Sequence, residues 1–432
     1  MQPYWETTVN MKKYPPLKGD ISTDVLIIGG GTAGILCGYK LKRAGVSCVI
    51  AEADRICRGV TSGTTAKITA QHGLIYNRLI NEFSTEKARM YLEANLNALD
   101  SYRELCEGID CGFETADSFV YTTDEPPKIE KEIIALDKIG FKADFCKETE
   151  LPFFTAGAVR FPKQAKFNPL KFLSALSDGL EIYENSRVKE LKGLTAVTDS
   201  GSIKAKKIIV ATHFPIINRH GLYFMKMYQK RSYVSAFENA VTVKGMYRDE
   251  ADSGFSFRSD GELLIVGSAS ARTGRKTAGW AQNLKFAEQC CPGAVQKYFW
   301  AAEDCITLDG VPYAGNYSSA TPDLYVTTGF NKWGMTSAMA AAELVCDMIT
   351  GRENPYRELF SPSRSMMRKQ LFVNGISAVG GLVTPTAKRC PHLGCALKRN
   401  KHEHSWDCPC HGSRFSENGK LLDGPATSDA EL

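Results

Sequence analysis

Near its N-terminus the chain reads Asp24-Val-Leu-Ile-Ile28-Gly29-Gly-Gly31-Thr-Ala-Gly34, and this segment decides the fold. Its first half is a short apolar run, typical of a buried parallel strand, and a glycine turn follows at once. Residues 32–43 then predict a helix, and residues 47–51 predict a second strand that ends in Glu52. The order of strand, glycine turn, helix, strand and acid predicts a parallel α/β sheet that binds a dinucleotide.

The residue types in this segment suit that ligand. Glycines let the backbone approach a pyrophosphate, the helix N-terminus stabilises its charge, and Glu52 can accept hydrogen bonds from ribose hydroxyls. A second small-residue segment, residues 58–67, follows the second strand and carries hydroxyls at Ser62, Thr64 and Thr65. We interpret it as a loop that wraps the cofactor; an ordinary surface turn is the alternative.

The C-terminal part contains a second pattern: Cys390-Pro-His392, then fifteen residues, then Cys408-Pro-Cys-His411. Each half offers one thiolate and one imidazole, and two of each form the ligand set of a Rieske [2Fe–2S] centre. A Cys₂His₂ zinc site uses the same four atoms, but zinc fingers usually group Cys with Cys and His with His. The pattern therefore predicts a metal centre and favours the cluster.

Bulk properties narrow the class of protein. A length of 432 residues predicts two or three domains, and 43% hydrophobic residues suffice for their cores. The net charge is +5 without a long basic run, which argues against a nucleic-acid partner. Residues 1–20 lack the apolar core of a signal peptide, and no stretch approaches the ~20 apolar residues of a membrane span. We therefore expect a cytoplasmic protein with no membrane span.

The two metal-binding segments, Cys390-Pro-His-Leu-Gly-Cys395 and Cys408-Pro-Cys-His-Gly-Ser413, closely resemble the cluster-binding loops of Rieske proteins from respiratory cytochrome complexes. The resemblance implies a [2Fe–2S] cluster and a disulfide between Cys395 and Cys410. The ligands that it implies are Cys390, His392, Cys408 and His411. Phe415 stands where that family has a tyrosine, and Ser413 is retained. Since hydrogen bonds to the cluster raise its potential, the loss of one hydroxyl predicts a lower potential than in the respiratory proteins.

Residues from about 20 to 360 resemble the FAD-dependent amine and amino-acid oxidoreductases of the D-amino-acid oxidase type, which include glycine and sarcosine oxidases. The shared motifs are Gly29-x-Gly31-x-x-Gly34, Glu52, the strand end Ala211-Thr212, Asp309-Gly-x-Pro312, and Gly329 through Thr336. The segment from Thr64 to Gly73 looks typical of a bacterial subgroup that also carries a Rieske module.

That resemblance implies FAD, a substrate lying between the flavin ring and an antiparallel sheet, and hydride transfer from a CH-NH or CH-NH2 group. Its partners are then a small amine or amino-acid substrate and an external one-electron carrier. The residues expected at FAD are Gly29, Gly31, Gly34, Glu52, Ser62, Thr64, Thr65, Val188, Ala211, Asp309, Gly334, Met335 and Thr336.

The expected architecture is α/β: a discontinuous Rossmann-like FAD-binding domain, an antiparallel-sheet substrate domain, and a small, abbreviated all-β Rieske module. The FAD-binding domain is expected at residues 20–110, 186–222 and 306–355, and the substrate domain at residues 111–185 and 223–305. A linker at residues 356–378 leads to the Rieske module at residues 379–432.

Catalytic residues do not stand out in the sequence. His72, Arg258 and Lys332 are candidates, and a structural role for His72 is equally compatible with its surroundings. The arginine that holds the substrate carboxylate in the family has no clear counterpart. Arg231, Arg258 and Arg272 are candidates for it, with a surface or ion-pair role as the alternative for each.

Three functions remain open. The first is an FAD-dependent amine or amino-acid dehydrogenase or oxidase that relays single electrons through the cluster. The second is an NAD(P)H-linked reductase that feeds the cluster, although the sequence has no second nucleotide motif. The third is a non-catalytic redox sensor or electron-transfer protein. A Rieske oxygenase is disfavoured because the histidines outside the cluster motif show no paired pattern for a mononuclear iron.

Overall fold

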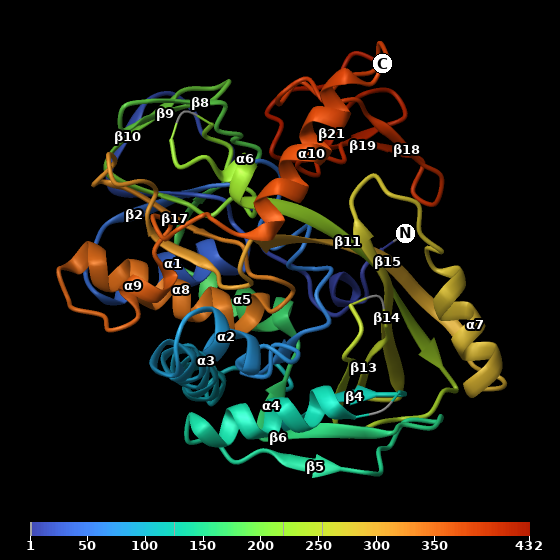
Figure 1. Ribbon diagram of the computed structural model, residues 1–432. Coiled ribbons are helices and arrows are strands. Elements are labelled where there is room, and N and C mark those ends of the chain that lie inside the picture. Colours follow the sequence, from blue (N-terminus) through green and yellow to red (C-terminus); the bar gives the residue numbers. More distant parts are fainter. Residues whose placement is uncertain (1, 125, 219, 253) are drawn as a thin grey trace.

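The structure is a computed structural model that describes residues 2–124, 126–218, 220–252 and 254–432 (Figure 1). Within these residues lie an eight-stranded sheet, a nine-stranded sheet and a small four-stranded sheet close to the C-terminus. The two large sheets share one body, and the small sheet lies at one end of it, beyond β11 (Figure 1). This architecture confirms the predicted α/β class with an antiparallel-sheet domain and a small all-β module.

The eight-stranded sheet is built around β1 (Ile21–Ile28), the strand of the glycine motif. Its parallel neighbours are β10 (Ser202–Val210) and β2 (Cys48–Ala51). The outer strands are β17 (Leu324–Thr328), β16 (Tyr313–Asn316) and β7 (Glu181–Tyr183), with β8 (Glu190–Lys192) and β9 (Thr195–Val197) as a hairpin beside β10. The last four residues of β1 are all buried, which explains why this strand is a continuous apolar run.

Helices cover the parallel sheet. Helix α1 (Thr32–Arg43) starts directly after the glycine turn and packs against α8 (Gly334–Thr350). Helix α8 ends at Gly351, whose φ of +75° gives the left-handed cap that glycine favours. Helix α3 (Thr85–Cys106) packs on α8 as well. The other helices of this body include η1 (Tyr4–Thr7), α2 (Tyr76–Glu82) and α5 (Pro169–Ser177).

The nine-stranded sheet is antiparallel except where β12 pairs with β4. Its strands, in spatial order, are β15 (Val295–Thr307), β11 (Met227–Glu238), β14 (Leu263–Arg272), β13 (Ser256–Asp260), β12 (Met246–Asp249), β4 (Glu114–Thr122), β6 (Gly157–Lys166) and β3 (Lys67–Ile68). Strand β5 (Asp144–Cys146) adds to β6, while α4 (Pro127–Lys138) and α7 (Ala281–Cys290) pack on the sheet.

Two short strands, β7 and β3, do not lie in the sheets expected from the predicted domain boundaries. Strand β7 pairs with β2 in the parallel sheet, although residues 111–185 were expected to serve the substrate domain. Strand β3 pairs with β6 in the antiparallel sheet, although residues 20–110 were expected to serve the FAD-binding domain. Both strands are two or three residues long, so neither carries a recognisable pattern of its own.

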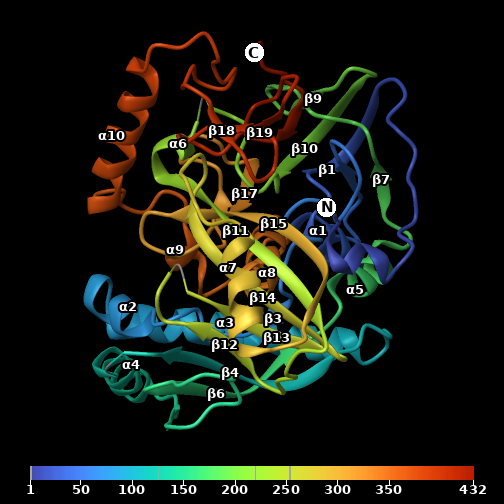
Figure 2. The same ribbon diagram turned by 90° about the vertical axis from the view of Figure 1, so that its right-hand side faces the viewer.

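The C-terminal module is a meander of four strands of three residues each: β18 (Lys398–Asn400), β19 (Ser405–Asp407), β20 (Arg414–Ser416) and β21 (Leu421–Asp423). Four of the seven residues in its small core are cysteines. Helix α10 (Lys369–Val383) precedes the module, crosses the predicted boundary at residue 379, and packs against α6 (Tyr223–Lys226) (Figure 2). A short helix, α9 (Arg357–Phe360), lies before it.

Among the described residues, we find no helix with the length and apolar character needed to cross a membrane.

Candidate functional site

A cavity of about 420 Å³ lies where the parallel sheet, the antiparallel sheet and the C-terminal module meet. The glycine turn and Glu52 line one end, and strands β11 to β15 line the middle. Residues of the C-terminal module, among them Asp423, Ala426 and Thr427, contribute a third wall. Three parts of the chain that are far apart in sequence therefore form one site.

Glycine is required at two positions of the turn. Gly29 has a φ of +107°, and a Cβ there would lie 2.5 Å from the carbonyl oxygen of Ala211. A Cβ on Gly34 would lie 1.9 Å from the carbonyl oxygen of Gly29. Helix α1 therefore approaches the end of β1 as closely as backbone atoms allow, which is the packing that a pyrophosphate-binding turn needs.

Glu52 fixes the end of β2 beside this turn. One carboxylate oxygen accepts a hydrogen bond from the backbone of Gly30 at 2.7 Å, and the other accepts from Asp54 at 2.9 Å. Burial raises the pKa of the Glu52 carboxyl. Because carboxylate oxygens can accept more than one hydrogen bond, a ribose hydroxyl remains a suitable further donor.

The structure brings most of the residues predicted at FAD together. Those that line the cavity are Gly29, Gly31, Glu52, Thr64, Thr65, Val188, Ala211, Gly334 and Met335. The remaining four, Gly34, Ser62, Asp309 and Thr336, lie behind its wall. Asp309, for example, pairs with Arg364 at 2.7 Å and so supports the loop before β16.

Of the three catalytic candidates, only Lys332 lines the cavity. His72 is buried behind it, where its ring nitrogens contact the hydroxyl of Tyr91 at 2.6 Å and the carbonyl oxygen of Thr69 at 2.9 Å. Burial lowers the pKa of His72 to about 3. Arg258 is also buried, and it donates to the carbonyl oxygens of Ala66 and Phe167. Neither His72 nor Arg258 lines the cavity.

The two other arginines proposed for a substrate carboxylate lie at the boundary with the C-terminal module. Arg231 pairs with Glu403 of the module. Arg272 donates to the carbonyl oxygens of Pro409 and Cys410, at 2.9 and 3.0 Å, and neither side chain lines the cavity.

Lys67 of β3 and Arg248 of β12 line the part of the cavity that faces the antiparallel sheet, while Arg55, Arg58 and Arg187 also line the cavity. The Lys67 ammonium donates to the hydroxyl of Ser256. Ser256 of β13 is the register partner of Arg248, so the three side chains share one area of the sheet. No local sequence signal marks them, because β3 and β12 meet only through strands β6 and β4.

The four predicted cluster ligands lie in the C-terminal module as a pair of thiols and a pair of imidazoles. The Cys390 and Cys408 thiols are close enough to share a hydrogen bond, which holds the pKa of Cys390 to about 7. The rings of His392 and His411 lie 5.0 Å apart. In the part of the chain that the structure describes, the Nδ1 atoms of both rings are buried without a hydrogen-bond partner.

Those orphaned nitrogens fit a group that binds two imidazoles and two thiolates. Burial lowers the pKa of His392 to about 4 and that of His411 to about 3, so both rings are neutral at pH 7, as metal ligands must be. The Nε2 atom of His392 contacts the side-chain oxygen of Asn218 at 2.9 Å. A disulfide joins Cys395 to Cys410 and so connects the two ligand loops.

Phe214 lies between the cavity and the ligand loops. Its ring lines the cavity, and its centroid is 6.5 Å from that of His392 and 6.0 Å from that of His411. Gln229 makes a second link, because it lines the cavity and its amide donates to the carbonyl oxygen of His411 at 2.7 Å.

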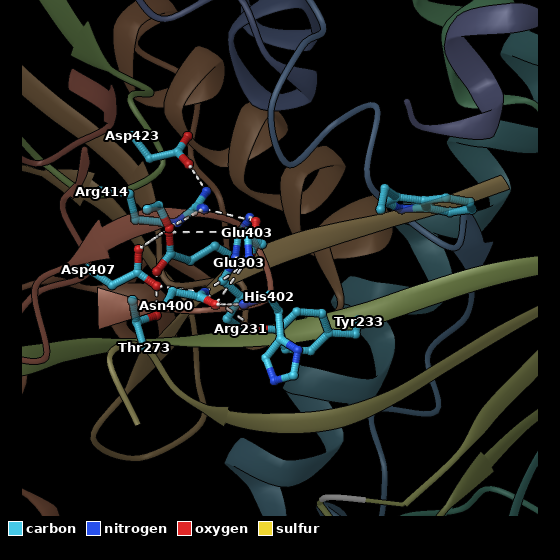
Figure 3. Close-up of polar contacts among 12 residues, drawn as sticks. Arg231, Tyr233, Thr273, Glu303, Asn400, His402, Glu403, Asp407, Arg414 and Asp423 are labelled. Atoms are coloured by element: carbon cyan, nitrogen blue, oxygen red, sulfur yellow. Dashed lines mark hydrogen bonds and ion pairs between the residues drawn. The ribbon is translucent and has the colours of Figure 1, made fainter. Parts of the chain in front are cut away.

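A buried ion network fastens the module to the antiparallel sheet (Figure 3). Arg231 of β11 pairs with Glu403, which also accepts from Arg414 at 2.8 Å. Arg414 in turn pairs with Asp407 at 3.2 Å and with Asp423 at 2.9 Å. Burial raises the pKa of Glu403, but the hydrogen bonds and charges of the two arginines outweigh that effect and hold it below its usual value.

Comparisons with known proteins agree with both halves of this site. Residues 24–348 match the family model described as FAD dependent oxidoreductase (DAO), and residues 362–431 match that of the Rieske [2Fe-2S] domain. The chain is 34% identical to YhfW of Bacillus subtilis (strain 168), named as a Rieske 2Fe-2S iron-sulfur protein, across 98% of this chain and 96% of the relative.

Solved structures share the fold of the larger part. The glycine oxidase of Geobacillus kaustophilus superposes with a TM-score of 0.66 at 21% identity, covering 80% of this chain and 99% of its own. The L-proline dehydrogenase of P. horikoshii superposes with a TM-score of 0.67 at 16% identity, covering 81% of this chain and 98% of its own.

Proposed function

From the premise that the chain belongs to the FAD dependent oxidoreductase (DAO) family and carries a Rieske [2Fe-2S] domain, we propose that it is an amine or amino-acid dehydrogenase. It takes hydride from a carbon next to nitrogen and releases the electrons one at a time to an external carrier. FAD supplies hydride acceptance, and a Rieske cluster supplies single-electron transfer.

The observation that carries this proposal is the shared wall between cavity and ligand loops. Phe214 contacts both histidines and also faces the cavity. Gln229 holds the backbone of His411 from the same side. These contacts form a short path of protein atoms from the cavity to the ligand loops, and a short path favours electron transfer between two centres.

The substrate side of the cavity carries groups suited to a polar amine. Ser232 of β11 and Asp304 of β15 both line it, and the ammonium of Lys332 contacts them at 2.7 and 3.4 Å. The Asp304 carboxylate can pair with a substrate ammonium and so orient the carbon beside it. Burial lowers the pKa of Lys332, with Asp304 opposing that effect, so this lysine is a candidate for holding or accepting a proton.

The first experiment compares two phenylalanines. Phe224 also contacts His411, with ring centroids 6.2 Å apart, but it does not line the cavity. In anaerobic rapid mixing of the holoprotein with substrate, F214L is expected to slow the appearance of the reduced-cluster EPR signal while flavin bleaching stays fast. F224L serves as the matched control and is expected to leave both phases near wild type. Equal behaviour of the two variants contradicts a route along Phe214.

The second experiment identifies the electron donor. A panel of amino acids and secondary amines is mixed anaerobically with the holoprotein, and bleaching of the flavin absorbance is recorded. Bleaching by members of the panel supports the dehydrogenase. Bleaching by NADH, with no response across the panel, identifies the alternative reductase. Slow or absent bleaching by both, together with a cluster that titrates normally, identifies a redox sensor.

A further inference from the structure

Three cationic side chains line the part of the cavity that faces the antiparallel sheet: Lys67, Arg248 and Lys332. Lys67 is 9% exposed, and Lys332 has a side chain that is 14% exposed. Placing three positive charges in one enclosed space is costly unless negative charge compensates them.

The described residues supply little of that negative charge. Lys67 has a hydroxyl, that of Ser256, as its hydrogen-bond partner. Arg248 pairs with Asp252, which is half exposed and 3.7 Å away, and the carboxylates of Asp249 and Asp304 also act on its charge. Lys332 pairs with Asp304 at 3.4 Å.

The other acids that line the cavity serve different partners. Glu52 accepts from the backbone at the dinucleotide end. Glu303 lies 3.8 Å from Arg231 and accepts from Thr273. Asp423 pairs with Arg414, and Asp54 pairs with Arg58 at 3.4 Å. Asp304 is therefore the one cavity-lining carboxylate, among the residues described, that faces the three cations.

We propose that the substrate carries two acid groups, one held by Lys67 and Arg248 and the other by Lys332. This inference rests on the proposed oxidation of an amine or amino acid and specifies its class: a dicarboxylic amino acid, or a secondary amine with an acid group on each arm. A single carboxylate satisfies one of the two cationic positions and leaves the other without a counter-charge.

The sheet register separates the two positions by a distance that such a molecule spans. Ser256, which marks the first position, lies on β13, and Ser232, which marks the second, lies on β11. Two strand spacings separate them across the sheet, since β14 lies between, and Ser256 is level with Val234, two residues along β11 from Ser232, so the backbone separation is about 12 Å. Lysine and arginine side chains reach inward from both sides and shorten the gap between the charged groups.

The charge balance also suits an amine. A substrate with two carboxylates and one ammonium brings a net charge of −1, opposite in sign to the cationic side chains on this part of the cavity. The Asp304 carboxylate can accept the substrate ammonium while Lys332 turns to the adjacent acid group. The nitrogen is then held between the two acid-binding positions.

A binding experiment tests the inference without requiring turnover. The oxidised holoprotein is titrated with non-oxidisable acids, and the flavin difference spectrum gives the dissociation constants. Succinate and glutarate are expected to bind at least about tenfold more tightly than butyrate and than the monoamides of the same diacids. Equal affinity for diacids and monoacids in the wild type overturns the inference.

Variants assign the two positions. In R248M, K67M and K332M, the ratio of the monoacid to the diacid dissociation constant is expected to fall to between one and about three. The conservative variants K332R and R248K keep the positive charge and are expected to keep part of the wild-type ratio. The matched control is K206M, an exposed lysine whose side chain is 80% accessible, which is expected to keep the wild-type ratio. A tenfold ratio that persists in all three cavity variants also overturns the inference.

Turnover separates this inference from the function on which it rests. Aspartate, glutamate and iminodiacetate are compared with asparagine, glutamine and sarcosine in anaerobic flavin reduction. Faster reduction by the diacids supports both proposals. Equal or faster reduction by the neutral counterparts keeps the dehydrogenase and refutes the diacid preference. No reduction by either set, with tight diacid binding, refutes the dehydrogenase and keeps the binding site.

Discussion

Replacing Arg231 by methionine should loosen the C-terminal module from the antiparallel sheet. Arg231 is 7% exposed and pairs with Glu403, whose side chain is 1% exposed. Removing one partner of a buried ion pair costs about 3–5 kcal/mol, because the other charge stays buried without compensation. Arg414 still contacts Glu403 at 2.8 Å, so the lower end of that range applies, about 3 kcal/mol.

A loss of about 3 kcal/mol corresponds to a rise of roughly 100-fold in the population of the undocked module. Native-state hydrogen exchange of β19 and β20 measures this opening, because amides in those strands exchange when the module separates and loosens. We expect their exchange in R231M to be roughly 100-fold faster than in the wild type, while amides of β1 keep their protection.

The matched control is E238Q. Glu238 lies on the same strand as Arg231 and pairs with Lys297 of β15, but both side chains are about half exposed. Exposed pairs contribute roughly 0–1 kcal/mol, so exchange in E238Q should change by less than about fivefold. An R231M protein that behaves like E238Q refutes the view that the buried network holds the module in place.

Three further predictions follow from the same contacts. G34A should bind little or no FAD, because its Cβ would lie 1.9 Å from the Gly29 carbonyl oxygen; a normal ratio of 450 to 280 nm absorbance contradicts this. His72 has a folded-state pKa of about 3, below its unfolded value, so the unfolded chain binds more protons and stability should fall as pH drops from about 6.5 towards 3. Denaturant titrations of H72Q should show a smaller loss of unfolding free energy over this pH range than the wild type. Parallel pH profiles of the two proteins would falsify the low pKa of His72. The double variant C395A/C410A should lower the stability of the module by about 3 kcal/mol, because the disulfide closes a loop of 15 residues. An unchanged melting curve, monitored by the EPR signal of the cluster, would exclude this loss of stability.

Features carried by contiguous residues could be predicted from the sequence. The helix expected at residues 32–43 has those bounds in the structure, because strand, glycine turn and helix are coded in one segment. The Rieske domain could be predicted for the same reason, since each Cys and His pair lies within one short loop, and the match over residues 362–431 includes both loops. The match to the FAD dependent oxidoreductase family and to the Rieske domain confirms the expected cofactors.

The substrate side of the site could not be predicted in the same way. Lys67 and Arg248 meet through strand pairings that span long sequence distances, and register is not encoded locally. Arg231 and Arg272 were candidates for binding a carboxylate because isolated arginines in strands look alike. Docking of the module decides their role, since Glu403 and the carbonyl oxygens of the second ligand loop become their partners.

The wall that residues 422–427 add to the flavin cavity bears on how the protein matures. A chain is synthesised from its N-terminus, so both large sheets and α8 are complete before the module emerges. The cavity then lacks the wall that the module adds later, and we expect FAD to enter from that side. Because the core of the module is largely cysteine, we expect cluster insertion to stabilise it. In iron-starved cells we therefore expect a flavin-loaded protein whose C-terminal wall of the cavity is not in place.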